Sequence, residues 1–123
     1  MIAMAEEESV LGWNPFSRNC ASRGLLNSIG DKWAILILAS LADGALRFGE
    51  LEEAVDGISQ KMLAQRLGDM VADGLVTRAQ FQEVPPRVEY ELTDLGRSAL
   101  PAVQGLIDWT VGHMSQVYET RQK

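Results

Sequence analysis

The chain has few of the residues that build catalytic and metal sites. Its 123 residues include one cysteine, Cys20, and one histidine, His113. A single thiol cannot form a disulfide within the chain, and an isolated histidine cannot complete a Cys/His metal cluster. No Ser/His/Asp set and no glycine-rich phosphate loop stands out. We therefore expect no enzyme, no cofactor and no bound metal.

Long hydrophobic runs are also missing. The longest, residues 33–39, falls far short of the roughly 20 apolar residues that a membrane-spanning helix needs. The first residues, MIAMAEEES, lack the basic start and apolar stretch of an export signal. Apolar residues still make up 46% of the chain, enough for one folded core. We expect a single domain in the cytoplasm, without membrane contact.

Basic residues are scarce, since 11 of them face 17 acidic residues and the net charge is −6. Indiscriminate coating of nucleic acid needs a basic surface, and this balance argues against it. The acids are unevenly distributed, however. Glu6–Glu8 carry three of them and residues 43–56 carry five, whereas four bases balance four acids in residues 59–90. The charge thus remains compatible with a sequence-specific DNA reader.

The stretch Asp56–Val76 carries the clearest pattern in the chain. The residues that recur at helical spacing and predict a core-facing stripe are Leu63, Leu67, Met70, Val71 and Gly74. Ser59 stands at an N-cap position. Polar side chains around this start could bond to base edges, as a helix in the major groove requires. An ordinary amphipathic surface helix fits the stretch equally well. The residues predicted to face base edges are Ser59, Gln60, Lys61, Met62 and Gln65.

Three shorter helices are predicted before this stretch. Residues 19–29 have one apolar side, and residues 32–41 are apolar almost all round, which predicts the centre of the core. Asp31 is the expected N-cap of the second of these helices. Residues 47–55 form the third, followed by the turn Asp56-Gly57. The third helix, the turn and the next helix together predict a helix-turn-helix.

After this motif the hydrophobic period becomes that of strands. Residues 75–81 and 87–92 predict a hairpin, with Pro85-Pro86 near its tip. A helix-turn-helix followed by a hairpin is a winged helix. Arg87 lies beside the tip, where it would reach a phosphate or a narrow minor groove, as would Arg66 from the second helix of the motif. The alternative for Arg87 is an ion pair with a glutamate of the hairpin.

The last predicted helix, residues 94–119, is capped by Thr93 and broken or kinked at Pro101. Beyond Pro101, apolar residues recur every three or four positions. A winged helix does not need this stripe for its own core, so it predicts a subunit interface; the alternative is packing on the chain's own first helix. The predicted interface residues are Leu25, Val103, Leu106, Ile107, Trp109, Thr110, Met114 and Val117.

Cys20 stands near the start of the first helix, with Arg18 and Arg23 close in sequence. Such surroundings tend to lower a thiol pKa, which predicts a regulatory thiol that responds to oxidants or electrophiles. The alternative is a small, half-buried apolar residue. Regulation without the thiol is also possible, through an apolar effector that binds near Trp33 and Trp109.

An ordered series of motifs spans about residues 19–112. It consists of Cys20, Ile29-Gly30-Asp31-Lys32-Trp33, Arg47-Phe48-Gly49-Glu50-Leu51, residues 57–63 (GISQKML), Asp73-Gly74-Leu75-Val76, and residues 83–90 (EVPPRVEY) with Leu92-Thr93 and Gly96. Together they resemble the HxlR-type winged helix-turn-helix transcriptional regulators of bacteria.

The resemblance implies a homodimer whose outer helices pack across a two-fold axis. It implies recognition helices in successive major grooves of an inverted repeat, and it matches Cys20 to the cysteine with which some members sense quinones, aldehydes or oxidants. Glu52 and Glu53 depart from the pattern, because a basic residue often stands there. Phosphate contacts are therefore left to Arg47, Lys61 and Arg87.

The predicted fold is mainly α with a small β-hairpin, a winged helix-turn-helix with an additional C-terminal dimerisation helix. It occupies residues 19–119, after a tail of residues 1–18 that is partly disordered or packed on the dimer and before a tail of residues 120–123. The chain is predicted to be a transcriptional regulator that binds double-stranded DNA as a homodimer, and a repressor rather than an activator. Its DNA binding would be switched by modification of Cys20 or by a small-molecule effector. The rival is a winged helix that contacts a protein through its acidic surface.

Overall fold

The computed structural model describes residues 12–123. The prediction for Glu6–Glu8 lies outside these residues. In chain order the elements are α2 (Ala21–Ile29), α3 (Lys32–Ser40), β1 (Leu46–Arg47), α4 (Phe48–Ala54), α5 (Gln60–Ala72), β2 (Val76–Phe81), β3 (Arg87–Leu92), α6 (Asp94–Ser98) and α7 (Leu100–Arg121). None of the helices in this range is both long and apolar enough to cross a bilayer.

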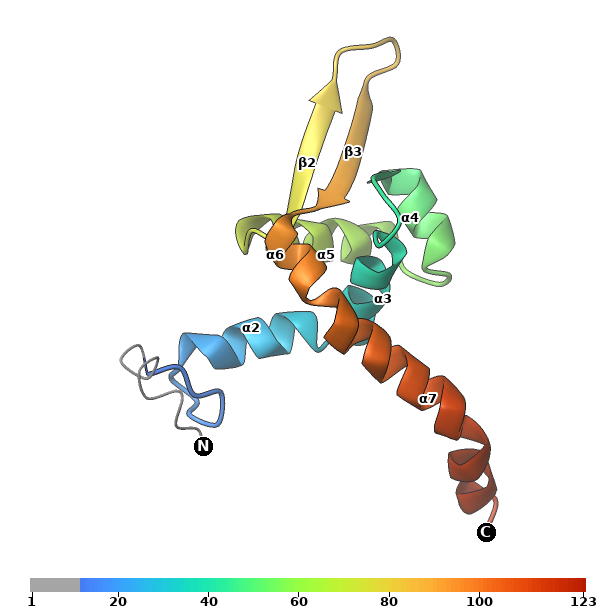
Figure 1. Cartoon of the computed structure of the whole chain (residues 1–123). Coiled ribbons are helices and arrows are strands. Elements are labelled where there is room, and N and C mark those ends of the chain that lie inside the picture. Colours follow the sequence, from blue (N-terminus) through green and yellow to red (C-terminus); the bar gives the residue numbers. More distant parts are fainter. Residues whose placement is uncertain (1–11) are drawn as a thin grey trace.

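The hairpin β2–β3 and the helices α2 and α7 project in three directions from a central body, and the C-terminus lies at the far end of α7 (Figure 1). The body holds the hydrophobic core, to which α3 contributes Ala34, Ile37 and Leu38. Helix α5 adds Leu63, Leu67 and Met70, as predicted for its buried stripe. Two other residues of that prediction are wrong, because Val71 is 38% exposed and Gly74 is an exposed residue of the turn after the helix. The remaining core residues are Leu41, Leu51, Val55, Ile58, Leu75, Val76, Leu92 and Val103.

The helix-turn-helix consists of α4, the turn and α5. Gly57 in the turn has φ 92°, a left-handed conformation that suits a residue without Cβ. Ser59 caps α5, because its Oγ accepts a hydrogen bond of 3.0 Å from the Met62 N–H. The predicted start of α4 at Arg47 is one residue early, since Leu46–Arg47 forms a strand that pairs with β3. Sequence reasoning missed this strand.

The three strands form an antiparallel sheet in the order β1-β3-β2. Strands β2 and β3 pair from Val76 opposite Leu92 to Phe81 opposite Arg87. Residues 82–86 make the tip, as the two prolines predict. The hairpin is the wing, and the predicted fold of a winged helix-turn-helix with a small β-structure is confirmed.

The predicted last helix is divided at Ala99 into α6 and α7, so the predicted break is confirmed but lies two residues before Pro101. Pro101 stands in the first turn of α7, where its missing N–H leaves no helical bond unmade. Thr93 caps α6 as predicted, accepting from the Gly96 N–H at 3.0 Å. Its hydroxyl also donates to the Gly74 carbonyl at 2.7 Å, which ties α6 to the base of the wing.

Candidate nucleic-acid interface

The exposed face of α5 brings together polar residues that were predicted to read bases. Ser59, Gln60, Lys61 and Gln65 are all exposed at or after the N-terminus of this helix. Met62 differs from them, because it is half-buried and packs against the core beside Leu63. Its side chain is therefore better explained by packing than by the predicted contact with base edges.

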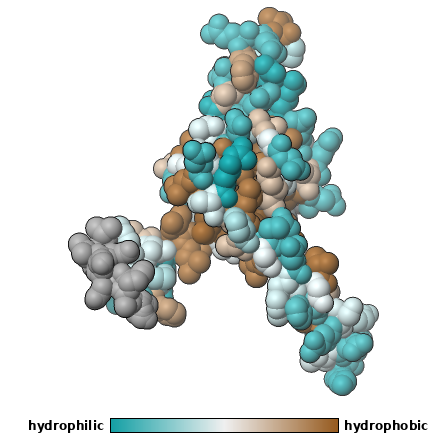
Figure 2. All heavy atoms as spheres, viewed as in Figure 1, coloured by the Kyte–Doolittle hydropathy of each residue, from teal (hydrophilic) through white to brown (hydrophobic). Residues whose placement is uncertain are grey.

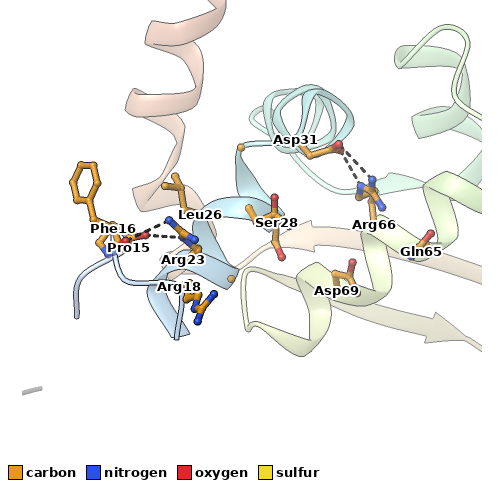
Figure 3. Close-up of a pocket in the computed structure, with 13 residues that line it drawn as sticks. Pro15, Phe16, Arg18, Arg23, Leu26, Ser28, Asp31, Gln65, Arg66 and Asp69 are labelled. Carbon is orange, nitrogen blue, oxygen red and sulfur yellow. Dashed lines mark hydrogen bonds and ion pairs between the residues drawn. The ribbon is translucent and has the colours of Figure 1, made fainter. Parts of the chain in front are cut away.

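Arg66 points from α5 towards the start of α3 (Figure 3). Its Nε donates to Asp31 Oδ2 at 2.8 Å and its Nη2 to Asp31 Oδ1 at 3.3 Å. The hydrogen bond from Arg66 lowers the pKa of Asp31, although partial burial opposes the shift, and the same bond raises the pKa of Arg66. The guanidinium would have to leave Asp31 to reach a phosphate, so this geometry does not support its predicted DNA contact.

Arg87 lies at the start of β3 between two carboxylates. Its Nη2 is 3.0 Å from Glu83 Oε2 and its Nη1 is 3.2 Å from Glu89 Oε2. The guanidinium also stacks 4.1 Å from the centroid of the Phe81 ring, and its Nε is buried without a hydrogen-bond partner. The structure thus shows the ion pairs that were the alternative for this residue. A DNA contact by Arg87 would require both pairs to open.

Three other basic side chains are exposed and could contact a DNA phosphate more readily than Arg66 or Arg87. Arg47 precedes α4, Lys61 lies in the first turn of α5, and Arg78 lies on the wing strand β2. None of the three forms an ion pair with another residue of the range 12–123. Arg78 is a site candidate that sequence reasoning missed. The alternation of the strand did not show which face of the sheet carries Arg78. In the structure both faces of β2 are exposed after Val76, so Arg78 reaches solvent.

Cys20 is a half-buried free thiol at the N-cap of α2. Its Sγ lies 3.1 Å from Ser22 Oγ and accepts a hydrogen bond of 3.1 Å from the Asn14 N–H. These contacts lower the pKa of the Cys20 thiol, the Ser22 bond most strongly. The direction agrees with the prediction, and the Ser22 backbone N–H at the start of α2 contributes to it, but neither Arg18 nor Arg23 does. Arg23 instead donates to the Pro15 and Phe16 carbonyls at 2.9 and 3.3 Å.

The surface of the described residues includes the following two hollows. An open groove of about 1160 Å³ is lined by residues 15–31 on one side and by Gln65, Arg66 and Asp69 of α5 on the other (Figure 3). A smaller hollow lies beside Trp109 and His113 on α7, and Trp33 lines neither of the two. No three His, Cys, Asp or Glu side chains within residues 12–123 gather in a way that could hold a metal ion.

Several residues of the predicted dimer interface are exposed apolar side chains on α2 and α7. Leu25, Leu106, Trp109 and Met114 have 44–56% of their surface exposed. In Figure 2 hydrophobic residues continue from the central body onto the α2 arm, and separate ones stand out along α7. The prediction that Val103 lies in the dimer interface is wrong, because Val103 is only 6% exposed and belongs to the chain's own core. The other predicted interface residues are Thr110, which is exposed, Val117, which is half-buried, and Ile107, which packs partly against the core.

Known proteins share this architecture. The model of the HxlR-like helix-turn-helix family matches residues 28–118. The HTH-type transcriptional regulator YtfH of Escherichia coli is 38% identical over 110 residues, which cover 89% of this chain and 87% of that protein. The solved structure of ytfH from Salmonella typhimurium has a TM-score of 0.86 at 40% identity and covers 90% of this chain and 99% of that one.

A structure described as the redox regulator HypR in its oxidized form is also similar. It has a TM-score of 0.70 at 36% identity and covers 76% of this chain and 96% of that one. The family match extends from the end of α2 to the C-terminal part of α7, and so includes the helix-turn-helix, the wing and most of α7. The chain therefore belongs to the HxlR-like helix-turn-helix family of transcriptional regulators.

Proposed function

We propose that the chain is a homodimeric repressor that binds an inverted-repeat DNA operator. The exposed start of α5 is the observation that carries this proposal. Gln60, Lys61 and Gln65 combine base-reading chemistry with a helix N-terminus, which favours phosphate. Arg47, Arg78 and, once released from its glutamates, Arg87 would contact the backbone.

The exposed apolar side chains of α2 and α7 support the homodimer. Leu106, Trp109 and Met114 lie on a helix that leaves the body, and 44–56% of the surface of each side chain is exposed. Apolar side chains grouped in this way mark an interaction surface, and a two-fold dimer covers the same patch on both subunits. The two copies of α5 would then face two half-sites of a symmetric operator.

The switch rests on Cys20 or on an effector. The lowered pKa of the Cys20 thiol favours the reactive thiolate. A hydroperoxide would oxidise it to a sulfenic acid and leave as water or an alcohol, and the partner's Cys20 thiol could then form a disulfide with release of water. Because Cys20 caps α2, a disulfide to the partner's Cys20 would shift the dimer helices and so the spacing of the recognition helices. An apolar ligand near Trp109, beside the smaller hollow, is the second candidate.

A winged helix that contacts a protein instead of DNA is the second candidate function. The net charge of −6 favours it, as does the pairing of Arg66 and Arg87 with carboxylates. DNA binding that survives excess competitor would exclude it as the main function.

The proposed function is tested by fluorescence anisotropy in reductant and excess competitor, with labelled duplexes selected by the protein from a random pool. We expect Gln65→Ala to weaken binding to the selected duplex by about 1–3 kcal/mol and to relax the preference at one base pair, because a direct base contact is lost. Gln122→Ala, at an exposed glutamine just after the end of α7, is the matched control and should bind like the wild type. Failure of the wild type to select any duplex would overturn the proposal.

A further inference from the structure

The Asp31 carboxylate joins α3, a helix of the core, to α5, the proposed recognition helix. It stands between α2 and α3, where Oδ2 accepts hydrogen bonds from the Trp33 and Ala34 N–H groups at 3.1 and 3.3 Å and caps α3. The same carboxylate accepts both bonds from Arg66 of α5, which lies 35 positions further along the chain. One side chain thus holds both the start of α3 and the recognition helix.

Arg66 lies on α5 between the exposed face that would read DNA bases and the face that packs in the core. Gln65, the residue before it, belongs to the exposed reading face, and Leu67, the residue after it, is buried in the core. Any shift of Arg66 relative to Asp31 therefore moves or rotates the reading face with respect to the start of α3. A bidentate guanidinium–carboxylate pair restricts both distance and orientation, which a single contact cannot do.

A groove lies beside the pair, although α5 and α3 also share the hydrophobic core. It separates the segment of residues 15–31, which includes α2, from α5, and it is open to solvent (Figure 3). Packed side chains therefore do not fill the space between these two helices. The Asp31–Arg66 pair lies at this groove and joins α5 to the point where α2 meets α3.

We propose that Asp31 and Arg66 are a positioning pair that fixes α5 relative to the α2–α3 junction, and thereby sets the separation of the two recognition helices in the dimer. This inference rests on the proposed function. In a dimer held through α2 and α7, each α5 reaches its half-site only at the angle that its own subunit allows. The pair fixes the orientation of α5 within its subunit, so the dimer prefers operators with one spacing between the half-sites.

An opposite role for Arg66 makes a contrary prediction. If Arg66 were a phosphate ligand that Asp31 merely occupies in the free protein, removal of the Asp31 charge would release it and tighten DNA binding. If the two residues position α5, the same change weakens binding. The sign of the effect therefore separates the two roles.

The first test uses Asp31→Asn, because asparagine caps a helix as well as aspartate does but cannot form the ion pair. The probes are the duplex selected by the wild type and versions with one base pair added to or removed from the spacer between its half-sites. We expect about tenfold weaker binding to the selected duplex, in the range typical of energetic coupling between sites. The preference for the selected spacer should also fall, whereas a loss of overall stability would weaken all three duplexes alike.

Asp73→Asn is the matched control, since it removes one acid at the exposed end of α5 without breaking an ion pair within residues 12–123. It should keep the spacer preference. Tighter or unchanged binding by Asp31→Asn, or an unchanged spacer preference, would overturn the proposal. A wild type that selects no duplex would overturn the proposed function, and this inference with it.

The second test uses Arg66→Gln and the double variant with Asp31→Asn. For a pair that acts as one unit, we expect the double variant to bind no more weakly than either single variant. The dependence of affinity on salt should stay that of the wild type. A salt slope lower by about 1 in Arg66→Gln would identify a lost phosphate contact and overturn the positioning role.

Discussion

At the scale of the residue, contacts within the chain decide which charges a partner can reach. Arg66 and Arg87 both hold carboxylates, at 2.8 and 3.0 Å. Lys61 and Arg78 form no ion pair among residues 12–123 and are exposed. Counting basic residues would treat all four alike, whereas only the latter two can meet a phosphate without breaking an existing bond.

The Asp31–Arg66 pair makes stability depend on pH. The pKa of Asp31 is held below its ordinary value of 3.8 by the Arg66 hydrogen bond, so the pair stabilises the folded state above that value. We expect Asp31→Asn to lower the free energy of unfolding by about 1 kcal/mol at pH 7, since both side chains remain partly exposed. The difference from wild type should vanish as the pH falls below 3.8 through the folded-state pKa. Urea unfolding at several pH values measures it, and a difference that persisted in acid would contradict the ion-pair account.

The Cys20 thiol should lose reactivity when its main hydrogen bond is removed. Ser22→Ala takes away the contact that lowers the Cys20 pKa most, so a smaller fraction of thiolate remains at neutral pH. We expect alkylation by iodoacetamide at pH 7 to slow by roughly twofold or more. Ser17→Ala, at a nearby exposed serine, is the control. Equal rates for Ser22→Ala and wild type would show that Ser22 does not activate the thiol.

At the scale of the element, close backbone contact sets where the wing and α6 meet. Gly96 is buried in α6, and a Cβ on it would lie 2.1 Å from the Leu75 carbonyl oxygen, nearer than atoms can approach. The Thr93 hydroxyl bonds to the Gly74 carbonyl at the same junction. The absence of a side chain at position 96 therefore allows the wing to start against α6.

Substitution of this glycine should be far more harmful than helix propensity suggests. We expect Gly96→Ala to lower the free energy of unfolding by about 1–3 kcal/mol, because backbone must shift to make room for the methyl group. Gly105→Ala is the control, since Gly105 lies inside α7 with no atom near its virtual Cβ. That change should stabilise the chain by about 0.5–1 kcal/mol. Thermal unfolding compares the two, and a neutral Gly96→Ala would contradict the close contact.

At the scale of the whole molecule, a small body carries three projecting arms (Figure 1). The hairpin pairs its own strands, but α2 and the outer part of α7 leave apolar side chains uncovered. A domain of this size cannot bury such arms by itself, since its core already lies in the central body. Assembly with a second copy is the expected solution, and it would place two recognition helices on one operator.

The dimer should depend on the apolar residues of α7. We expect wild type to sediment at twice the 13.5 kDa of the chain and Leu106→Asp to sediment as a monomer, because a charge would be buried in the interface. Val84→Asp is the control, since Val84 is an equally apolar and fully exposed residue at the tip of the wing. Sedimentation velocity gives the answer. A Leu106→Asp protein that remained dimeric would place the interface elsewhere.

The sequence by itself determined the elements and their order. Helical spacing in α5, alternation in the hairpin and the caps Asp31, Ser59 and Thr93 are local signals, because backbone conformation and a buried face depend on near neighbours. The fold class and the family resemblance followed from these signals. Strand β1 did not, since two residues are too short to show a period.

Only the tertiary structure decided what the individual side chains contact. Arg66 meets Asp31 across 35 positions, and Val103 reaches the core from a helix that sequence patterns assigned to an interface. Cys20 bonds to Ser22 and Asn14 instead of meeting the arginines beside it in sequence. The partners of Arg66 and Val103 depend on how distant elements pack, and those of Cys20 depend on how the chain turns just before α2. Periodicity carries no information on either. The sequence therefore identified a winged helix, while tertiary contacts determined which of its charges are available.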